Sequence, residues 1–149
     1  MIRSDAEYDN AMTRLQADIE VINEQRRRLR ELDLTADEVE RALQPAISFH
    51  AQLQEEVAAY EAMRRGDLTP IHSLGEIGRI LIGLRIAQGL SQRDLAERLG
   101  VNESSVSRDE RNDYHGITVE RANRIVAALN GRVRLEAEVI DDHANMAYA

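Results

Sequence analysis

Polar residues between positions 103 and 111 have the types and spacing of a surface that contacts DNA. Residues that recur at steps of three and four share one face of a helix, and those at this spacing are Glu103, Ser104, Ser107, Arg108 and Arg111. Hydroxyl and carboxylate groups hydrogen-bond to base edges, and an arginine binds guanine through two hydrogen bonds. The chemistry expected of this face is therefore contact with bases in the major groove.

The segment 85–112 also predicts the elements that would present this face. Ser91 and the acidic residue three positions later have the spacing of a capping box, which starts a helix. Gly100 ends that helix where a left-handed backbone is favoured, and Asn102 is an N-cap for the next helix. Val106 is expected to point inward. The pattern predicts two short helices joined by a tight turn, which is a helix-turn-helix.

The run LSQRDLAERLGV, followed by SSVSR, resembles the lambda-repressor/Cro-type (Xre) helix-turn-helix family, and the resemblance extends over about residues 73–130. It implies a lambda-repressor-like fold that binds double-stranded DNA. By this resemblance Gln92 would hold a phosphate or flank a base. Base edges would be contacted by Glu103, Ser104, Ser105 and Arg108, with Arg111 as the next candidate.

The same family pairs an arginine of its first helix with a glutamate near the end of the recognition helix, and Arg85 and Glu110 match these positions. Both should face inward, so we expect a structural pair. Asp109 departs from the family, which has Ile, Leu or Trp there. A carboxylate on an inner face costs free energy unless it is paired. Either the helix is displaced or Asp109 has a partner.

Residues 1–66 predict an N-terminal helical region. Apolar residues at alternating steps of four and three form a heptad seam, with Arg26 in one core slot: Tyr8, Met12, Leu15, Ile19, Ile22 and Leu29. The seam could be one arm of a helical hairpin or a two-stranded coiled coil between chains. Pro45 is expected to end or kink the helix that follows Thr35.

Residues 67–72 are the expected linker, and 73–131 the DNA-binding domain. Its first helix is apolar on two faces, which predicts a second contact, with the upstream helices or with a partner subunit. The period-two segment 132–140 predicts one C-terminal β-strand without a partner strand in the chain. Residues 141–149 are a tail.

The charges of this strand suggest that it pairs with a second copy of itself. Antiparallel pairing about Leu135 would place Arg132 opposite Glu138 and Arg134 opposite Glu136, and such pairs are favourable. The strand is therefore predicted to join a homodimer. The alternative is an exposed strand that stays unpaired.

Composition restricts the classes of function. The 149-residue chain has a formal net charge of −8, so DNA affinity must come from a local basic cluster. That cluster comprises Arg79, Arg85, Arg93, Arg98, Arg108, Arg111, Arg121 and Arg124. There is no cysteine and no metal-binding or catalytic motif, so we expect no cofactor, no metal and no enzymatic activity. The absence of a signal peptide or long apolar run predicts a cytoplasmic protein without membrane contact.

A mainly α protein with a helix-turn-helix domain predicts a dimeric transcriptional repressor that binds an inverted-repeat operator. A helical extension ahead of an Xre domain in a small acidic chain is similar to autoregulating antitoxins, in which the N-terminal helices would hold a protein toxin. Phage and housekeeping regulators use the same domain. The alternative is a protein–protein interaction module that acts through residues 1–66 and does not use its helix-turn-helix to recognise an operator.

Overall fold

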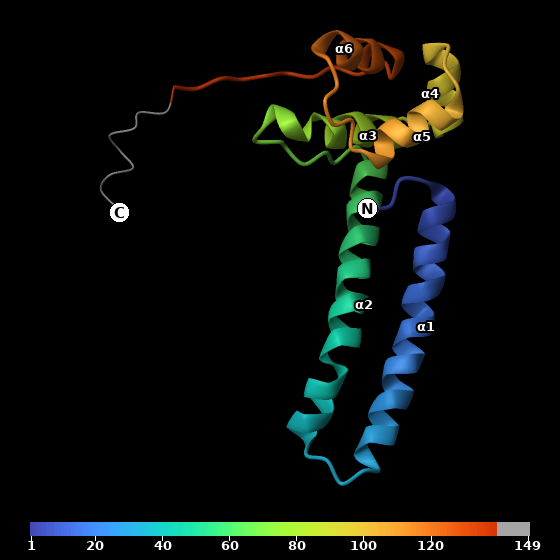
Figure 1. Cartoon of the computed structure of the whole chain (residues 1–149), viewed down its shortest axis with the longest axis vertical. Helices are drawn as coiled ribbons and strands as arrows, with labels where there is room; N and C mark the ends of the chain where they lie inside the picture. Colours follow the sequence, from blue (N-terminus) through green and yellow to red (C-terminus); the bar gives the residue numbers. More distant parts are fainter. Residues whose placement is uncertain (140–149) are drawn as a thin grey trace.

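The computed structural model describes residues 1–139, which form a helical hairpin that projects from a compact helical domain (Figure 1). The hairpin consists of α1 (Asp5–Arg30) and α2 (Ala36–Arg64). The domain contains η1, a 3-10 turn (Leu74–Glu76), and the helices α3 (Ile77–Ala87), α4 (Gln92–Leu99), α5 (Glu103–Arg111) and α6 (Val119–Ala128). None of the described helices is both long enough and apolar enough to cross a membrane.

The hairpin forms within one chain, because α1 and α2 pack against each other along their length. The side chains buried on these two helices are Ala11, Ile22, Val39, Leu43, Val57 and Tyr60. Part of the predicted seam is confirmed, because Ile22 is buried and Tyr8 and Leu15 pack against the core. Met12 and Ile19 are instead 43% and 49% exposed, and Ala11 is buried next to Met12. Arg26, in the polar slot of the seam, pairs with Glu40 across the hairpin at 2.8 Å.

Thr35 and Glu38 form a complete capping box at the start of α2. Of the two alternatives predicted for Pro45, an end of the helix is wrong, because α2 continues through Pro45 to Arg64. Pro45 is the tenth residue of this 29-residue helix and removes one backbone donor from its interior. Packing against α1 stabilises the helix on both sides of it, through Leu43 and Val57 among others.

The domain core is continuous with the base of the hairpin. Leu81, Ile82, Leu95, Ile125 and Leu129 are at most 1% exposed, and they belong to one cluster that also contains buried residues of both hairpin helices and of the N-terminal segment. The second apolar face of α3 is explained by this arrangement, because α3 contacts both α2 and α6. The upstream helices are its second contact.

The first four residues join the two parts of the molecule. Ile2 is buried in the shared cluster, and the amino group of Met1 lies 3.0 Å from the Glu56 carboxylate. Tyr60 donates a hydrogen bond to Asp5 at 3.0 Å. Burial, together with this hydrogen bond, raises the pKa of Tyr60 to about 12. The N-terminal segment therefore packs between hairpin and domain instead of extending into solvent.

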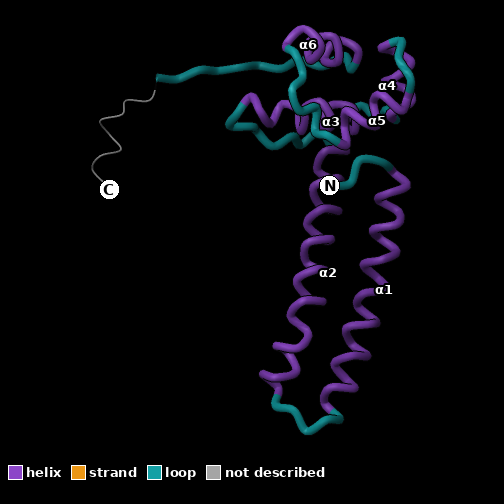
Figure 2. Tube along the Cα trace, in the orientation of Figure 1, coloured by secondary structure: helices purple, strands orange, loops and turns teal. Residues whose placement is uncertain are grey.

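The predicted C-terminal strand is not present. Residues 132–139 are extended but have no strand pairing, and Figure 2 shows only helices and loops in the described part of the chain. Residue 140 and the tail 141–149 lie outside the described residues. A strand is defined by hydrogen bonds to a neighbouring strand, and residues 1–139 contain no such neighbour. Five residues predicted for a dimer strand are consequently exposed: Arg132, Arg134, Leu135, Glu136 and Glu138.

Candidate nucleic-acid interface

The turn between α4 and α5 has the predicted local geometry. Ser91 caps α4 in a capping box with Asp94, and the hydrogen bonds from Ser91 lower the pKa of Asp94 below its usual value. Gly100 ends α4 with φ at 67°, in the left-handed region. Asn102 is the N-cap of α5 by backbone conformation, although its side chain makes no capping hydrogen bond. These local signals fix the start of α5.

Helix α5 presents the predicted polar face to solvent. Its exposed residues include Glu103, Ser104, Arg108 and Arg111. Ser105 and Ser107 are half-buried at the edges of this face, whereas Val106 and Glu110 are buried beneath it. Six of the residues predicted to contact DNA therefore lie on one helix. Their contact with bases stays a prediction.

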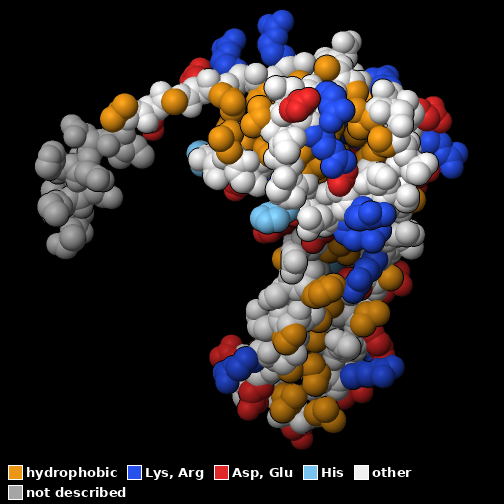
Figure 3. Space-filling view, turned by 45° about the horizontal axis from the view of Figure 1, so that its top comes forward, with side chains coloured by type: hydrophobic (Ala, Val, Ile, Leu, Met, Phe, Trp, Pro, Cys, Tyr) orange, Lys and Arg blue, Asp and Glu red, His pale blue; other side chains and the backbone are white. Residues whose placement is uncertain are grey.

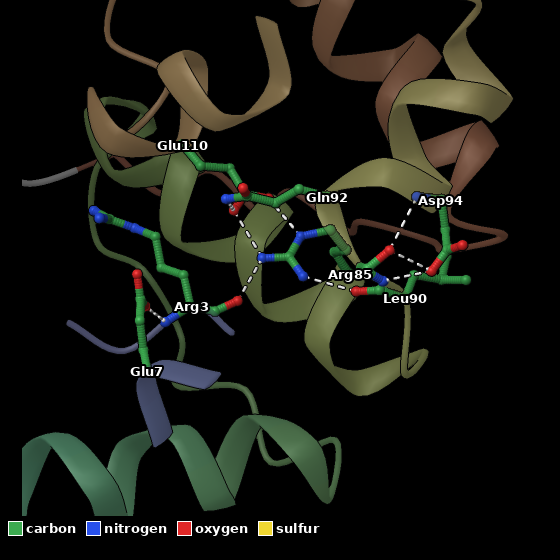
Figure 4. Close-up of polar contacts among 8 residues, drawn as sticks. Arg3, Glu7, Arg85, Leu90, Gln92, Asp94 and Glu110 are labelled. Carbon is green, nitrogen blue, oxygen red and sulfur yellow. Dashed lines mark hydrogen bonds and ion pairs between the residues drawn. The ribbon is translucent and has the colours of Figure 1, made fainter. Parts of the chain in front are cut away.

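Beneath the face, Arg85 of α3 and Glu110 of α5 form a buried ion pair with two hydrogen bonds (Figure 4). The distances are 2.5 Å from Nε to Oε1 and 2.7 Å from Nη2 to Oε2. Arg85 also donates to the carbonyl oxygen of Leu90 at 2.7 Å. The two residues are 2% and 0% exposed, so their role is to fix α5 against α3.

Gln92 belongs to the same cluster. Its side-chain amide donates to Glu110 Oε2 at 2.8 Å, and the residue is half-buried. The resemblance predicts a phosphate or base contact for Gln92. In this structure its amide nitrogen donates to the buried carboxylate, which is a role that sequence spacing did not indicate. The contact of Gln92 with DNA stays a prediction.

The N-terminal segment completes the coordination of Arg85, a contact that the sequence analysis missed. Arg85 Nη2 donates to the Arg3 carbonyl oxygen at 2.8 Å (Figure 4), and the Arg3 guanidinium bonds Asp113, just after α5, at 2.9 Å. Residues 3 and 85 are far apart in sequence, so no local pattern could have paired them. The helical domain formed by α3 to α6 thus also includes the first residues of the sequence.

Asp109, which departs from the family pattern, has a partner on α6. Arg121 donates a hydrogen bond from Nη2 to its carboxylate. The side chain of Asp109 is 25% exposed, so the charge is neither fully buried nor fully solvated. A displaced helix is not needed to accommodate this carboxylate, because an arginine neutralises it.

Replacing Arg121 by alanine is expected to lower the free energy of unfolding by about 1 kcal/mol, because it leaves a half-buried carboxylate unpaired. Asp109→Leu, which introduces a residue usual in the family, should remove most of that loss in the Arg121→Ala background. Urea denaturation of the two single variants and the double variant measures the coupling. Arg124→Ala, on the same helix, is the control. Additive effects of the two substitutions would contradict a direct pair.

The eight arginines expected to supply DNA affinity do not have equivalent surroundings. Four form ion pairs inside the domain, namely Arg79, Arg85, Arg93 and Arg121. Arg98 donates to the carbonyl oxygen of Ala128 at 2.9 Å. Among residues 1–139, no hydrogen bond or ion pair involves the remaining three guanidinium groups, those of Arg108, Arg111 and Arg124. Two of these three lie on the exposed face of α5.

Comparison with known proteins agrees with this geometry. A family model described as "Helix-turn-helix" matches residues 82–135, which include α4, the turn and α5. No curated protein and no solved structure matches the chain. The segment 82–135 therefore belongs to the Cro/C1-type (Xre) helix-turn-helix family of DNA-binding transcription regulators.

Proposed function

We propose that this protein is a sequence-specific repressor that binds an inverted-repeat operator as a homodimer through α5. The observation that carries the proposal is the exposed face of α5, where Arg108 and Arg111 have no partner among the described residues while the opposite face is fixed by the Arg85–Glu110 pair. Two recognition helices in a dimer would lie about 34 Å apart, one turn of DNA. Occupation of the promoter then blocks transcription, and no reaction is assigned to the chain.

The second part of the proposal is that the protein is an antitoxin, which represses its own operon and binds a protein toxin. The surface of the hairpin supports this part. Apolar side chains are exposed along the hairpin between acidic and basic ones (Figure 3). They include Met12, Ile19 and Phe49, which are 43%, 49% and 52% exposed. Isolated apolar residues are common on surfaces, but several on one projecting hairpin favour a protein partner, either a toxin or a second copy.

The same apolar residues support the competing function, an interaction module that does not recognise an operator. The two candidates differ in a simple measurement. A repressor retards a specific DNA duplex in an electrophoretic mobility shift assay, and its affinity for that duplex falls as the salt concentration rises. An interaction module captures its partner through the hairpin and shows no preference among duplexes.

Arg108→Ala is expected to weaken binding to the operator by about 1–3 kcal/mol and to relax base preference at one position in each half-site. The reason is that Arg108 is exposed on α5, one turn after Ser104. Fluorescence anisotropy with the operator and with single-base variants measures both effects. Arg41→Ala, an exposed arginine on α2, is the control for lost charge. Unchanged affinity and selectivity of the Arg108 variant would show that α5 does not enter the groove as proposed.

A further inference from the structure

The leading ends of α4 and α5 are joined by a surface ion pair. Arg93 is the second residue of α4 and Glu103 the first residue of α5. Arg93 Nε donates to Glu103 Oε2 at 3.2 Å, and the two side chains are 73% and 50% exposed. The pair therefore lies at the surface, at the N-terminal end of α5, where the predicted DNA-contacting face begins.

The chemistry of Glu103 limits what it can contact in DNA. An ionised carboxylate accepts hydrogen bonds but donates none, and the phosphates of DNA repel it. The donors that bases present in the major groove are the exocyclic amino groups of cytosine and adenine. In adenine the amino group lies beside the acceptor N7, which also repels a carboxylate. Cytosine is thus the base that Glu103 fits best.

Arg93 supplies the positive charge and the hydrogen-bond donor that stabilise the carboxylate of Glu103 next to DNA. Its guanidinium neutralises the charge of Glu103 and holds Oε2, whereas Oε1 accepts no hydrogen bond from any residue within 1–139. Gln92, the preceding residue, is occupied by Glu110. Arg93 is accordingly the α4 side chain that orients the first residue of α5.

We propose that Arg93 is a positioning residue that orients Glu103, so that Glu103 Oε1 accepts a hydrogen bond from the N4 amino group of a cytosine in each operator half-site. This inference rests on the proposed function. It adds a specificity determinant that acts from α4 through a residue of α5. The competing role for Arg93 is a plain phosphate contact, in which the arginine leaves Glu103 when DNA binds.

The two roles are distinguished by selection of bound duplexes from a random library by the full chain. We expect the wild-type protein to prefer cytosine at one position per half-site by about tenfold. Arg93→Gln should reduce that preference to about twofold and leave the other positions unchanged. Glu103→Gln should shift the preference at the same position to adenine, because a glutamine amide pairs with adenine N6 and N7. Arg41→Gln, an exposed arginine of the hairpin, should change no preference.

Three results would overturn the inference. If Arg93→Gln weakens all duplexes by one factor and reduces the slope of log affinity against log salt by about 0.9, Arg93 contacts a phosphate. If the wild type prefers adenine at the affected position, the assignment to cytosine is wrong. In both cases operator recognition stands. If the wild type selects no sequence at all, the proposed function fails and this inference fails with it.

Discussion

Replacing Glu110 by alanine is expected to lower the free energy of unfolding by about 3–5 kcal/mol, because it leaves the guanidinium of Arg85 buried without its counter-ion. Arg85 is 2% exposed, so water cannot take the place of the carboxylate. The substitution also removes the acceptor for the Gln92 amide. Urea denaturation of the wild type and the variant measures the loss. Both the midpoint and the dependence of the unfolding free energy on urea concentration should be compared.

The matched control removes both charges. A buried ion pair can often be replaced by apolar residues of similar size at little cost, so Arg85→Met combined with Glu110→Leu should be far more stable than Glu110→Ala alone. The Arg3 and Leu90 carbonyl oxygens lose a donor in this double variant, which limits the recovery. If Glu110→Ala unfolds like the wild type but no longer binds the operator, Glu110 acts on DNA and not on the fold.

Gly78→Ala is expected to be the most damaging of the glycine-to-alanine changes, with a loss of unfolding free energy above about 3 kcal/mol. Overpacking a core usually costs about 1–3 kcal/mol. Here a Cβ at Gly78 would lie 1.9 Å from the carbonyl oxygen of Asp113 and 2.5 Å from its carbonyl carbon. Both are backbone atoms, so no side-chain rotation can relieve the clash. Either α3 or the loop after α5 must move, and thermal unfolding followed by circular dichroism measures the effect.

Gly75→Ala is the control for this prediction. A Cβ at Gly75 would meet only the Ser73 hydroxyl, at 3.4 Å, which is an ordinary contact. The two variants lie three residues apart and add the same atoms, so a difference between them reports the contact with Asp113. Equal melting temperatures for Gly78→Ala and the wild type would mean that the loop after α5 does not hold this close approach in solution.

The elements that depend on neighbouring residues could be predicted from the sequence. The capping box at Ser91 and the left-handed Gly100 are fixed by residues within one turn of each other, and both are confirmed. The capping box at Thr35 is confirmed for the same reason. The position of the polar face on α5 follows from helical spacing alone.

Contacts between distant parts of the chain could not be predicted in this way. Arg121 is twelve residues from Asp109 and on another helix, so the sequence left open whether α5 is displaced or Asp109 has a partner, and it could not indicate which residue that partner is. Met12 fits the heptad seam of α1 because it lies four residues after Tyr8 and three before Leu15. Close packing of α1 on α2 instead places Ala11 inside. The alternation of apolar and charged residues in 132–139 is typical of a β-strand. A segment forms a strand only when it is hydrogen-bonded to a second strand, and the alternation does not supply one.

The hydrogen bond from Arg85 to the Arg3 carbonyl oxygen spans 82 positions of sequence. We therefore expect the unit that unfolds cooperatively to be larger than the region that carries the family resemblance. It should also contain the first four residues and the base of the hairpin, whose buried side chains share the core of the domain. Such a non-local contact has to form before the domain reaches its final packing, and contacts of high sequence separation slow folding. Because a chain is synthesised from its N-terminus, the hairpin can pack against the domain only after α3 to α6 have been synthesised.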